Sequence, residues 1–421
     1  GALLASAEPV KIFHAARQDM EVLQHTLGVL PGALFDTQIA AALSGYGEQV
    51  GYARLVKEIC DVELSKAYTR TAWCRRPLND EEIRYALDDA HYLGDLHQHL
   101  KTILQQRGRT AWATEDFSLL ACGDVIEAGS ASGGVAFHEA VQAVASGYSD
   151  TVLVTGVEKM SDILPDVVTT ALAMAEEQEY TAYTGVTKTG IAAMIHRLYL
   201  DRYAEASEVC MMAVKSHEHA VGCKHAQYPF KMSIERAMSS PMEANPIHMM
   251  ECAGIGDGAA AIVLVPADNA GVEVAGSAIA TDYTSIAQRL DPMAMDAIRK
   301  AADRAYKMAG ITAKEVHDDF TINGVLGVEG LGLAKDGEGA KLVSTEEVDK
   351  AGKIPINTFG GLKARGNPLG ATGIYQVAEV ALQLRGDAGD HQVEGAKYGV
   401  AQNSGGMASI CAVNVLRRAK K

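Results

Sequence analysis

The chain has 421 residues, of which 48% are hydrophobic and 22% charged, and its formal net charge is −15 at pH 7. This composition is too apolar for a disordered chain and suits two or three globular domains, while the negative charge argues against a nucleic-acid-binding surface over most of the chain. The seven cysteines form no CxxC pair, and no hydrophobic run approaches the roughly 18 residues of a membrane span, which indicates a cytoplasmic protein without a disulfide framework or membrane contact.

The first 120 residues are predicted to be mostly helical. Hydrophobic residues recur at helical spacing over residues 19–30 and 33–43, and Pro31 and Gly32 separate the two stretches. The clearest helix is predicted over residues 80–106.

That third helix carries a tyrosine and a carboxylate on one face. Asn79 or Asp80 can act as its N-cap, because their side chains accept hydrogen bonds from free backbone amides. Tyr85 and Asp89 are four residues apart and so lie one above the other. Such a pair could bind a metal ion and orient a water molecule, or it could be a packed tyrosine beside a solvated aspartate.

Several strings of this segment closely resemble the exonuclease domain of ribonuclease D. They are Lys11-Ile-Phe-His-Ala-Ala-Arg-Gln-Asp19, Leu34-Phe-Asp-Thr-Gln-Ile39, Arg84-Tyr-Ala-Leu-Asp-Asp-Ala-His-Tyr-Leu93 and Trp112-Ala-Thr-Glu-Asp-Phe117. That family is a two-metal 3′–5′ exoribonuclease with a ribonuclease H-like fold. The resemblance implies that Asp19 and Asp89 bind Mg²⁺ or Mn²⁺ and that Tyr85 orients the attacking water.

One motif of that family has no counterpart in the chain. The family's first motif is an Asp-x-Glu on an earlier strand, and Glu8 is the only acidic residue before Asp19. Two neighbouring Mg²⁺ ions need several anionic oxygens, so we expect the site to bind metal poorly. Residues 1–120 are therefore expected to be an exonuclease fragment, with RNA as a partner only if that fragment is active.

From about residue 124 the pattern changes to alternating strands and helices. Residues 151–156 and 259–265 are short, apolar strand candidates. A helix opening at 132–134 and a second opening at 372–373 have similar lengths and glycine punctuation, and a strand candidate follows each. We infer two duplicated α/β halves.

The start of the first of these helices has a composition suited to chemistry. Residues 129–134 read Gly-Ser-Ala-Ser-Gly-Gly, and such small residues let a substrate approach the backbone. Free N–H groups and the positive end of the helix dipole would stabilise an anion there. An ordinary serine-rich helix cap is the alternative.

Further strings, in this order, closely resemble the thiolase superfamily, especially archaeal acetyl-CoA acetyltransferases and sterol-carrier-protein-x type thiolases. They are Glu127-Ala-Gly-Ser-Ala-Ser-Gly-Gly134, Val154-Thr-Gly-Val-Glu-Lys-Met-Ser161, Val316-His-Asp-Asp-Phe-Thr321, Gly360-Gly-Leu-Lys-Ala-Arg-Gly-Asn-Pro-Leu-Gly-Ala-Thr-Gly373 and Asn403-Ser-Gly-Gly406. The resemblance implies a duplicated, five-layered αβαβα fold that lacks its start, with halves over residues 124–268 and 269–421. It also implies a coenzyme A thioester as substrate and a homodimer or homotetramer.

The resemblance places two altered residues at the reacting positions. Ser130 stands where the family has its nucleophilic cysteine, and Asn367 stands at the histidine of Gly-His-Pro. A serine hydroxyl has a far higher pKa than a thiol and needs an adjacent base, and an amide accepts no proton. Acyl-CoA binding is compatible with these residues, whereas condensation through Ser130 is not favoured.

Four further positions complete the expected site. The resemblance implies that His317 is retained and that Asp319 replaces the cysteine of His-Asp-Cys-Phe. Asn403 stands at the C-terminal cysteine position, and Gly405 matches the glycine whose N–H binds the thioester oxyanion. His317 and Asp319 would be the nearest bases. His317 read alone is equally well a structural histidine.

Three functions follow from these segments. We favour a thiolase-like acyltransferase, with a ribonuclease D-type exoribonuclease and a non-catalytic acyl-CoA-binding or scaffold subunit as alternatives. The two segments meet near residues 120–125 without a linker, as expected of a chimera. Close in sequence, His217, His219 and His225 have no ligand partners in the pattern, which predicts a solvated or interface helix rather than a metal site.

Overall fold

The computed structural model describes residues 2–27, 29–47, 50–64, 78–111, 113–114, 117, 126–266, 271–311 and 320–419. The chain divides into two compact units, Gly1–Val125 and Ile126–Lys421. No helix among the described residues is long and apolar enough to cross a bilayer.

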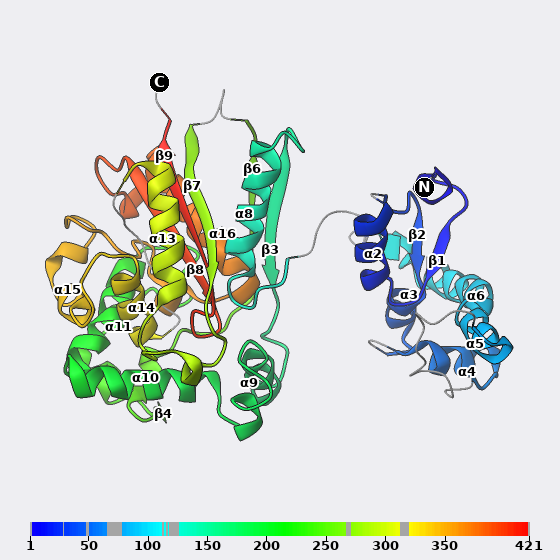
Figure 1. The fold of residues 1–421 in the computed structure, drawn as a ribbon, viewed down its shortest axis with the longest axis horizontal. Helices are drawn as coiled ribbons and strands as arrows, with labels where there is room; N and C mark the ends of the chain where they lie inside the picture. The colour runs from blue at the N-terminus through cyan, green and yellow to red at the C-terminus, as the bar shows by residue number, and fades with distance from the viewer. Residues whose placement is uncertain are drawn as a thin grey trace. The chain divides into compact units, whose positions relative to one another are not determined.

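The first unit is mostly helical, as the sequence predicts (Figure 1). Its elements are α1 (Ala2–Ala5), β1 (Lys11–Phe13), α2 (Arg17–Leu27), β2 (Leu34–Asp36), α3 (Thr37–Ser44), α4 (Tyr52–Cys60), α5 (Asp80–His91) and α6 (Leu93–Gln106). Strands β1 and β2 pair in parallel. Leu96, Leu100 and Leu104 recur every fourth residue of α6 and are fully buried against α3 and α4.

Two sequence predictions in this unit are corrected. The helix expected over residues 33–43 begins only at Thr37. Leu34–Asp36 instead forms a strand that pairs with β1, and the Asp36 carboxylate caps the N-terminus of the helix. Asp36 accepts hydrogen bonds from the backbone amides of Gln38 and Ile39 at 2.7 and 3.2 Å. An N-cap of this kind fixes where the helix starts.

The helix expected over residues 80–106 is broken into α5 and α6 at Tyr92. The Tyr52 hydroxyl donates to the carbonyl oxygen of Asp88 at 3.1 Å and accepts from the N–H of Tyr92 at 3.3 Å. These are the two groups that would bond each other in a continuous helix, so an inserted side chain replaces that bond. The predicted start is confirmed: Asn79 and Glu82 form a capping box.

The second unit is layered (Figure 1). Antiparallel strands β3 and β6 pack on one side of helices α8 and α16, and a three-stranded antiparallel sheet of order β7-β9-β8 packs on the other side. Helix α13 covers the outer face of that sheet. The helices are α8 (Ser132–Ala145), α9 (Pro165–Ala173), α10 (Lys188–Arg202), α11 (Ala206–Ala220), α12 (Ile234–Met238), α13 (Asp296–Ala309), α14 (Thr321–Gly330), α15 (Gly339–Val343) and α16 (Leu369–Arg385). The strands are β3 (Val152–Glu158), β4 (Met242–Ala244), β5 (Ile247–His248), β6 (Gly258–Leu264), β7 (Val272–Thr281), β8 (Tyr398–Gly405) and β9 (Ile410–Arg418).

The predicted repeat is visible in this arrangement. Each of α8 and α16 is followed by a strand, β3 and β8 respectively, and the two helices lie side by side between the sheets. Their starts approach closely: a Cβ built on Gly373 would lie 2.1 Å from the backbone nitrogen of Gly134. Glycine is therefore required where the two helices meet, which explains its presence in both motifs.

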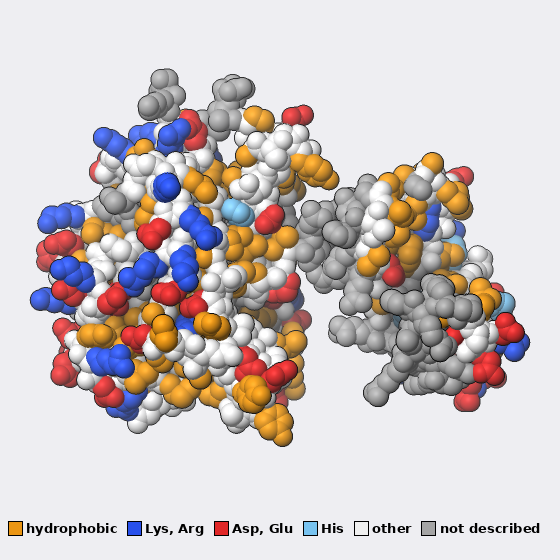
Figure 2. All heavy atoms as spheres, in the orientation of Figure 1, with side chains coloured by type: hydrophobic (Ala, Val, Ile, Leu, Met, Phe, Trp, Pro, Cys, Tyr) orange, Lys and Arg blue, Asp and Glu red, His pale blue; other side chains and the backbone are white. Residues whose placement is uncertain are grey.

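The outer face of β3 and β6 is apolar and exposed. Alternate residues of the two strands point away from α16, among them Leu153, Val157 and Val263, which are 64%, 68% and 60% exposed. Their neighbours Val154 and Ile262 face the helices and contribute to the core. Hydrophobic side chains are visible on this flank of the unit in Figure 2.

Candidate functional site

Ser130, at the expected nucleophile position, lies just before the start of α8. Ser130 is 4% exposed and lies two residues before α8, after Gly129, whose φ of 57° few other residues adopt. Ser132 closes this turn, since its hydroxyl donates to the carbonyl oxygen of Gly129 at 2.7 Å and accepts from the amide of Ala128 at 2.8 Å. The fold thus exposes little of Ser130 and fixes its backbone.

Asn403 clamps this turn from the neighbouring strand. Its Nδ2 donates to the carbonyl oxygen of Ser130 at 3.0 Å, and its Oδ1 accepts from the amide of Gly134 at 3.0 Å. The side chain belongs to β8 and is 1% exposed. Both ends of the amide therefore form hydrogen bonds that hold the start of α8.

Gly405 packs directly against the same turn. A Cβ at this position would lie 2.4 Å from the carbonyl oxygen of Ala128, closer than any real side chain allows. The structure therefore brings Ser130, Asn403 and Gly405 together at one end of α8.

Asn367 lies at the start of the second helix. It is 5% exposed, and its backbone N–H donates to the carbonyl oxygen of Gly254 at 3.0 Å. The Thr372 hydroxyl donates to Asn367 Oδ1 at 2.8 Å, which fixes the orientation of the amide and leaves Nδ2 as its donor. Helices α8 and α16 approach each other at Gly134 and Gly373. The start of α16 therefore lies beside the hydrogen bonds that Asn403 makes to the start of α8.

The two expected bases cannot be placed. His317 and Asp319 lie outside the described residues. The segment that follows them is anchored by a buried hydrogen bond of 3.0 Å from the Thr321 hydroxyl to Glu251, whose pKa burial raises. Among the described residues, no hydrogen bond joins the Ser130 hydroxyl to a histidine or a carboxylate.

Sequence reasoning missed several polar residues around these helix starts. Glu158 at the end of β3 accepts from the N–H of Gly370 at 3.0 Å and so caps α16 with a negative charge. The Thr372 hydrogen bond to Asn367 could have been predicted from the sequence, because the two residues are only five positions apart. The Glu158 contact joins residues far apart in the sequence and leaves no local signal.

The prediction for the three histidines is partly wrong. His217 is 0% exposed within α11, and burial lowers its pKa to about 4. His219 is partly buried, with 7% of its side chain exposed, and its Nδ1 lies 2.9 Å from the carbonyl oxygen of Ile356. His225 lies beyond the helix and contacts Glu379 at 3.1 Å. No metal-binding group of three or more His, Cys, Asp or Glu residues occurs in the part of the chain that the structure describes.

The expected metal ligands of the first unit are only partly described. Asp19 is an exposed residue of α2, and desolvation together with the charge of Asp36 raises the pKa of its carboxyl. Tyr85 and Asp89 lie in α5, as predicted, but the side chain of Asp89 is outside the described residues. The Asp36 carboxylate is occupied by backbone amides. The described side chains of this unit include no group of three or more potential metal ligands.

Comparison with known proteins matches the chain to thiolase and exonuclease families. Residues 55–240 match the family described as thiolase, N-terminal domain, and residues 278–418 match the thiolase C-terminal domain-like family. Residues 1–105 match a 3′–5′ exonuclease family. The N-terminal thiolase match and the exonuclease match overlap over residues 55–105.

Individual relatives fall into the same two groups. An acetyl-CoA acetyltransferase of Methanothermobacter thermautotrophicus is 44% identical over 305 residues, which cover 70% of this chain and 79% of the relative. A ribonuclease D of Gluconacetobacter diazotrophicus is 43% identical over 120 residues, covering 28% of this chain and 30% of the relative. The solved structure of the Ltp2-ChsH2(DUF35) aldolase has a similar fold, with a TM-score of 0.60 at 21% identity over 70% of this chain and 79% of that one. The chain therefore belongs to the thiolase family and also carries a ribonuclease D-like exonuclease segment.

Proposed function

We propose that the second unit binds an acyl-CoA thioester of the acetyl-CoA or acetoacetyl-CoA class at the start of α8. The observation that carries this proposal is the assembly of Ser130, Asn403 and Gly405 at one helix N-terminus. The relationship to acetyl-CoA acetyltransferases supports the choice of substrate class.

Binding in this proposal uses backbone and amide donors. The N–H groups of Ser130 and Gly405 donate to the thioester carbonyl oxygen, and the positive end of the α8 dipole stabilises the charge that develops there. Asn367 donates from Nδ2 to a second carbonyl oxygen, since Thr372 occupies its Oδ1. Asn403 keeps the Ser130 backbone in position.

We further propose that no acyl group is transferred to Ser130. Its hydroxyl needs a base to become a nucleophile, and Asn367, at the family's histidine position, cannot accept a proton. Asn403, at the position of the C-terminal cysteine, is committed to backbone hydrogen bonds. These three residues together support binding of a thioester without an acyl-enzyme at Ser130.

Calorimetric titration of the full chain with acetyl-CoA tests the binding proposal. We expect Ser130→Ala to bind with an affinity within about twofold of wild type, because the backbone N–H remains. Asn367→Ala should bind about tenfold more weakly, because one hydrogen bond to the substrate is lost. Absence of binding at millimolar acetyl-CoA would overturn the proposal.

A second candidate function is 3′–5′ exoribonuclease activity of the first unit, supported by its match over residues 1–105. The chain spans 30% of the length of the ribonuclease D relative. We rank this function second because the ribonuclease D relative matches 28% of this chain, against 70% for the acetyl-CoA acetyltransferase relative. Degradation of a 3′-labelled RNA with Mg²⁺ or Mn²⁺, abolished by Asp89→Asn, would support it.

Size-exclusion chromatography with light scattering tests the predicted homodimer or homotetramer.

A further inference from the structure

The turn that follows Gly405 holds an alanine in a backbone conformation that alanine rarely adopts. Gly405 ends β8, and the chain enters β9 at Ile410. Within this turn Gly406 and Ala408 both have a φ of 57°. Glycine adopts that angle readily, whereas a Cβ makes it unfavourable, so neighbouring groups must hold Ala408 in place. The turn begins at Gly405, whose N–H the proposed function assigns to the thioester.

Arg289 is one of the groups that hold this turn. It directly follows η4 (Ile286–Gln288), and 3% of its side chain is exposed. Its Nη2 donates to the carbonyl oxygen of Met407 at 2.8 Å, inside the turn, and to that of Tyr283 at 3.0 Å. The guanidinium therefore ties the β8–β9 turn to the loop after β7. The Asp282 carboxylate, 3.5 Å from Nε, offsets its charge.

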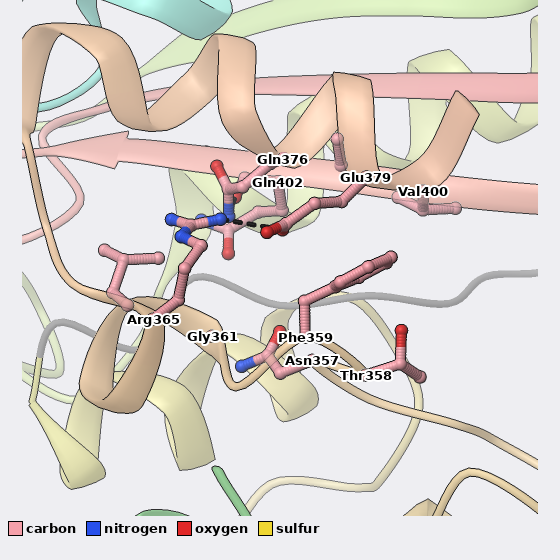
Figure 3. A pocket seen from close by; sticks show the side chains of 11 residues that line it. Asn357, Thr358, Phe359, Gly361, Arg365, Gln376, Glu379, Val400 and Gln402 are labelled. Carbon is pink, nitrogen blue, oxygen red and sulfur yellow. Dashed lines mark hydrogen bonds and ion pairs between the residues drawn. The ribbon is translucent and has the colours of Figure 1, made fainter. Parts of the chain in front are cut away.

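Another buried arginine of this unit makes a different set of contacts. Arg365 donates from Nη1 to Glu379 Oε2 at 2.7 Å, the dashed line in Figure 3, so it pairs directly with a carboxylate of α16. Such pairing is typical of a buried arginine. The two hydrogen bonds from Nη2 of Arg289 go instead to backbone carbonyl oxygens, which fixes the course of the chain.

A second residue of the same loop binds the other end of the turn. The N–H of Asp282 donates to the carbonyl oxygen of Ser409 at 2.8 Å. Met407 and Ser409 flank Ala408, so the loop binds a carbonyl group on each side of that residue. Ser409 in turn donates from its N–H to the carbonyl oxygen of Gly405 at 3.1 Å. The hydrogen bonds therefore run from the loop, through the turn, to Gly405 itself.

We propose that Arg289 is a positioning residue of the acyl-CoA site, which holds the β8–β9 turn so that the Gly405 N–H meets the thioester carbonyl oxygen. The inference rests on the proposed function, because it concerns the same donor. Arginine suits this role because its planar guanidinium keeps its N–H groups in fixed directions, so one nitrogen binds two carbonyl oxygens while Nε lies beside Asp282. A lysine keeps the charge and loses that fixed geometry.

Hydrogen–deuterium exchange of the full chain tests whether Arg289 holds the turn, and it needs no ligand. We expect Arg289→Lys to speed amide exchange over residues 405–409 about five- to tenfold and to leave β7 unchanged, because the hydrogen bond to the Met407 carbonyl is weakened. Arg289→Gln, which keeps an N–H donor without the charge, should show the same change and serves if the lysine variant does not fold. Arg418→Lys is the matched control, since Arg418 donates to the carbonyl oxygen of Leu384 at 2.8 Å from the far end of β9. Unchanged exchange in the turn of the folded variant would overturn the inference.

Calorimetry then separates positioning of the donor from a general structural role. Coenzyme A lacks the thioester carbonyl, so its affinity does not depend on the Gly405 N–H. Relative to wild type, we expect Arg289→Lys to bind acetyl-CoA about five- to tenfold more weakly and coenzyme A within about twofold, whereas Arg418→Lys should match wild type for both ligands. An equal loss of both affinities in Arg289→Lys would overturn the inference. Unchanged acetyl-CoA affinity in that variant would also overturn it and would leave the proposed function standing, whereas no binding of acetyl-CoA by wild type would overturn both.

Discussion

Replacement of Asn403 by aspartate tests the two hydrogen bonds through which this side chain holds the start of α8. The substitution keeps an oxygen that accepts from the Gly134 amide but removes the donor to the Ser130 carbonyl oxygen, 3.0 Å away. At neutral pH it also places a carboxylate against that carbonyl at a site that is 1% exposed. Loss of one hydrogen bond, an unsatisfied carbonyl and a buried charge together cost about 2–5 kcal/mol of unfolding free energy.

The same substitution should show a characteristic pH dependence. Burial raises the folded-state pKa of the new carboxyl above its unfolded value of about 3.9. When protonated, the carboxyl can donate to the Ser130 carbonyl and still accept from Gly134, so both hydrogen bonds return. The stability deficit of Asn403→Asp relative to wild type should therefore be smallest near pH 4. It should grow by about 1.4 kcal/mol per pH unit until the folded-state pKa is passed.

Urea unfolding of both proteins at pH 5 and pH 8, followed by far-ultraviolet circular dichroism, measures this deficit. Both tryptophans of the chain, Trp73 and Trp112, belong to the first unit, so their fluorescence follows that unit separately. Asn403→Ala is the control, because it loses both hydrogen bonds and adds no titrating group. A deficit for Asn403→Asp that is equal at both pH values, or absent at pH 8, would refute the reasoning.

Three other predictions concern separate parts of the chain. Tyr52→Phe removes the hydroxyl inserted between α5 and α6 and should destabilise the first unit by about 1 kcal/mol in urea unfolding followed by tryptophan fluorescence; an unchanged midpoint would contradict this. The His225 ring should titrate near pH 9 by NMR, and Glu379→Gln should lower that value. Because the folded-state pKa is raised above 6.5, this interaction stabilises the fold fully below pH 6.5 and is lost as the pH rises through about 9; a ring titrating near 6.5 would contradict it. Gly405→Ala should weaken acetyl-CoA binding at least tenfold in calorimetry, because a Cβ would lie 2.4 Å from the Ala128 carbonyl oxygen, and unchanged affinity would count against the site.

The sequence predicted those helices and strands that are determined by residues close together in the chain. Asn79 caps the start of α5 as expected, and the apolar runs over 151–156 and 259–265 correspond to β3 and β6. The break at Tyr92 could not be predicted, because its cause is a hydroxyl 40 residues away in the sequence.

The candidate site shows the same limit. Family resemblance identified Ser130 and Asn403 separately. The hydrogen bond from Asn403 Nδ2 to the Ser130 carbonyl oxygen joins residues 273 positions apart, and no sequence spacing predicts it. His225 was expected to be a solvated or interface residue because its partner, Glu379, follows 154 residues later. Contacts of this kind depend on how α8, α16 and the sheets pack, which composition and periodicity do not determine.

The central claim is that the second unit binds an acyl-CoA thioester without acylating Ser130, and mass spectrometry tests it most directly. The full chain is incubated with acetyl-CoA, quenched in acid and digested with trypsin, which releases residues 110–159 as one peptide. Fragment ions distinguish Ser130 from Cys122 within that peptide. We predict no acetyl group of about 42 Da on Ser130, under conditions where calorimetry shows bound acetyl-CoA. An acetyl group on Ser130 that accumulates within the time of turnover and is absent from Ser130→Ala would contradict the account.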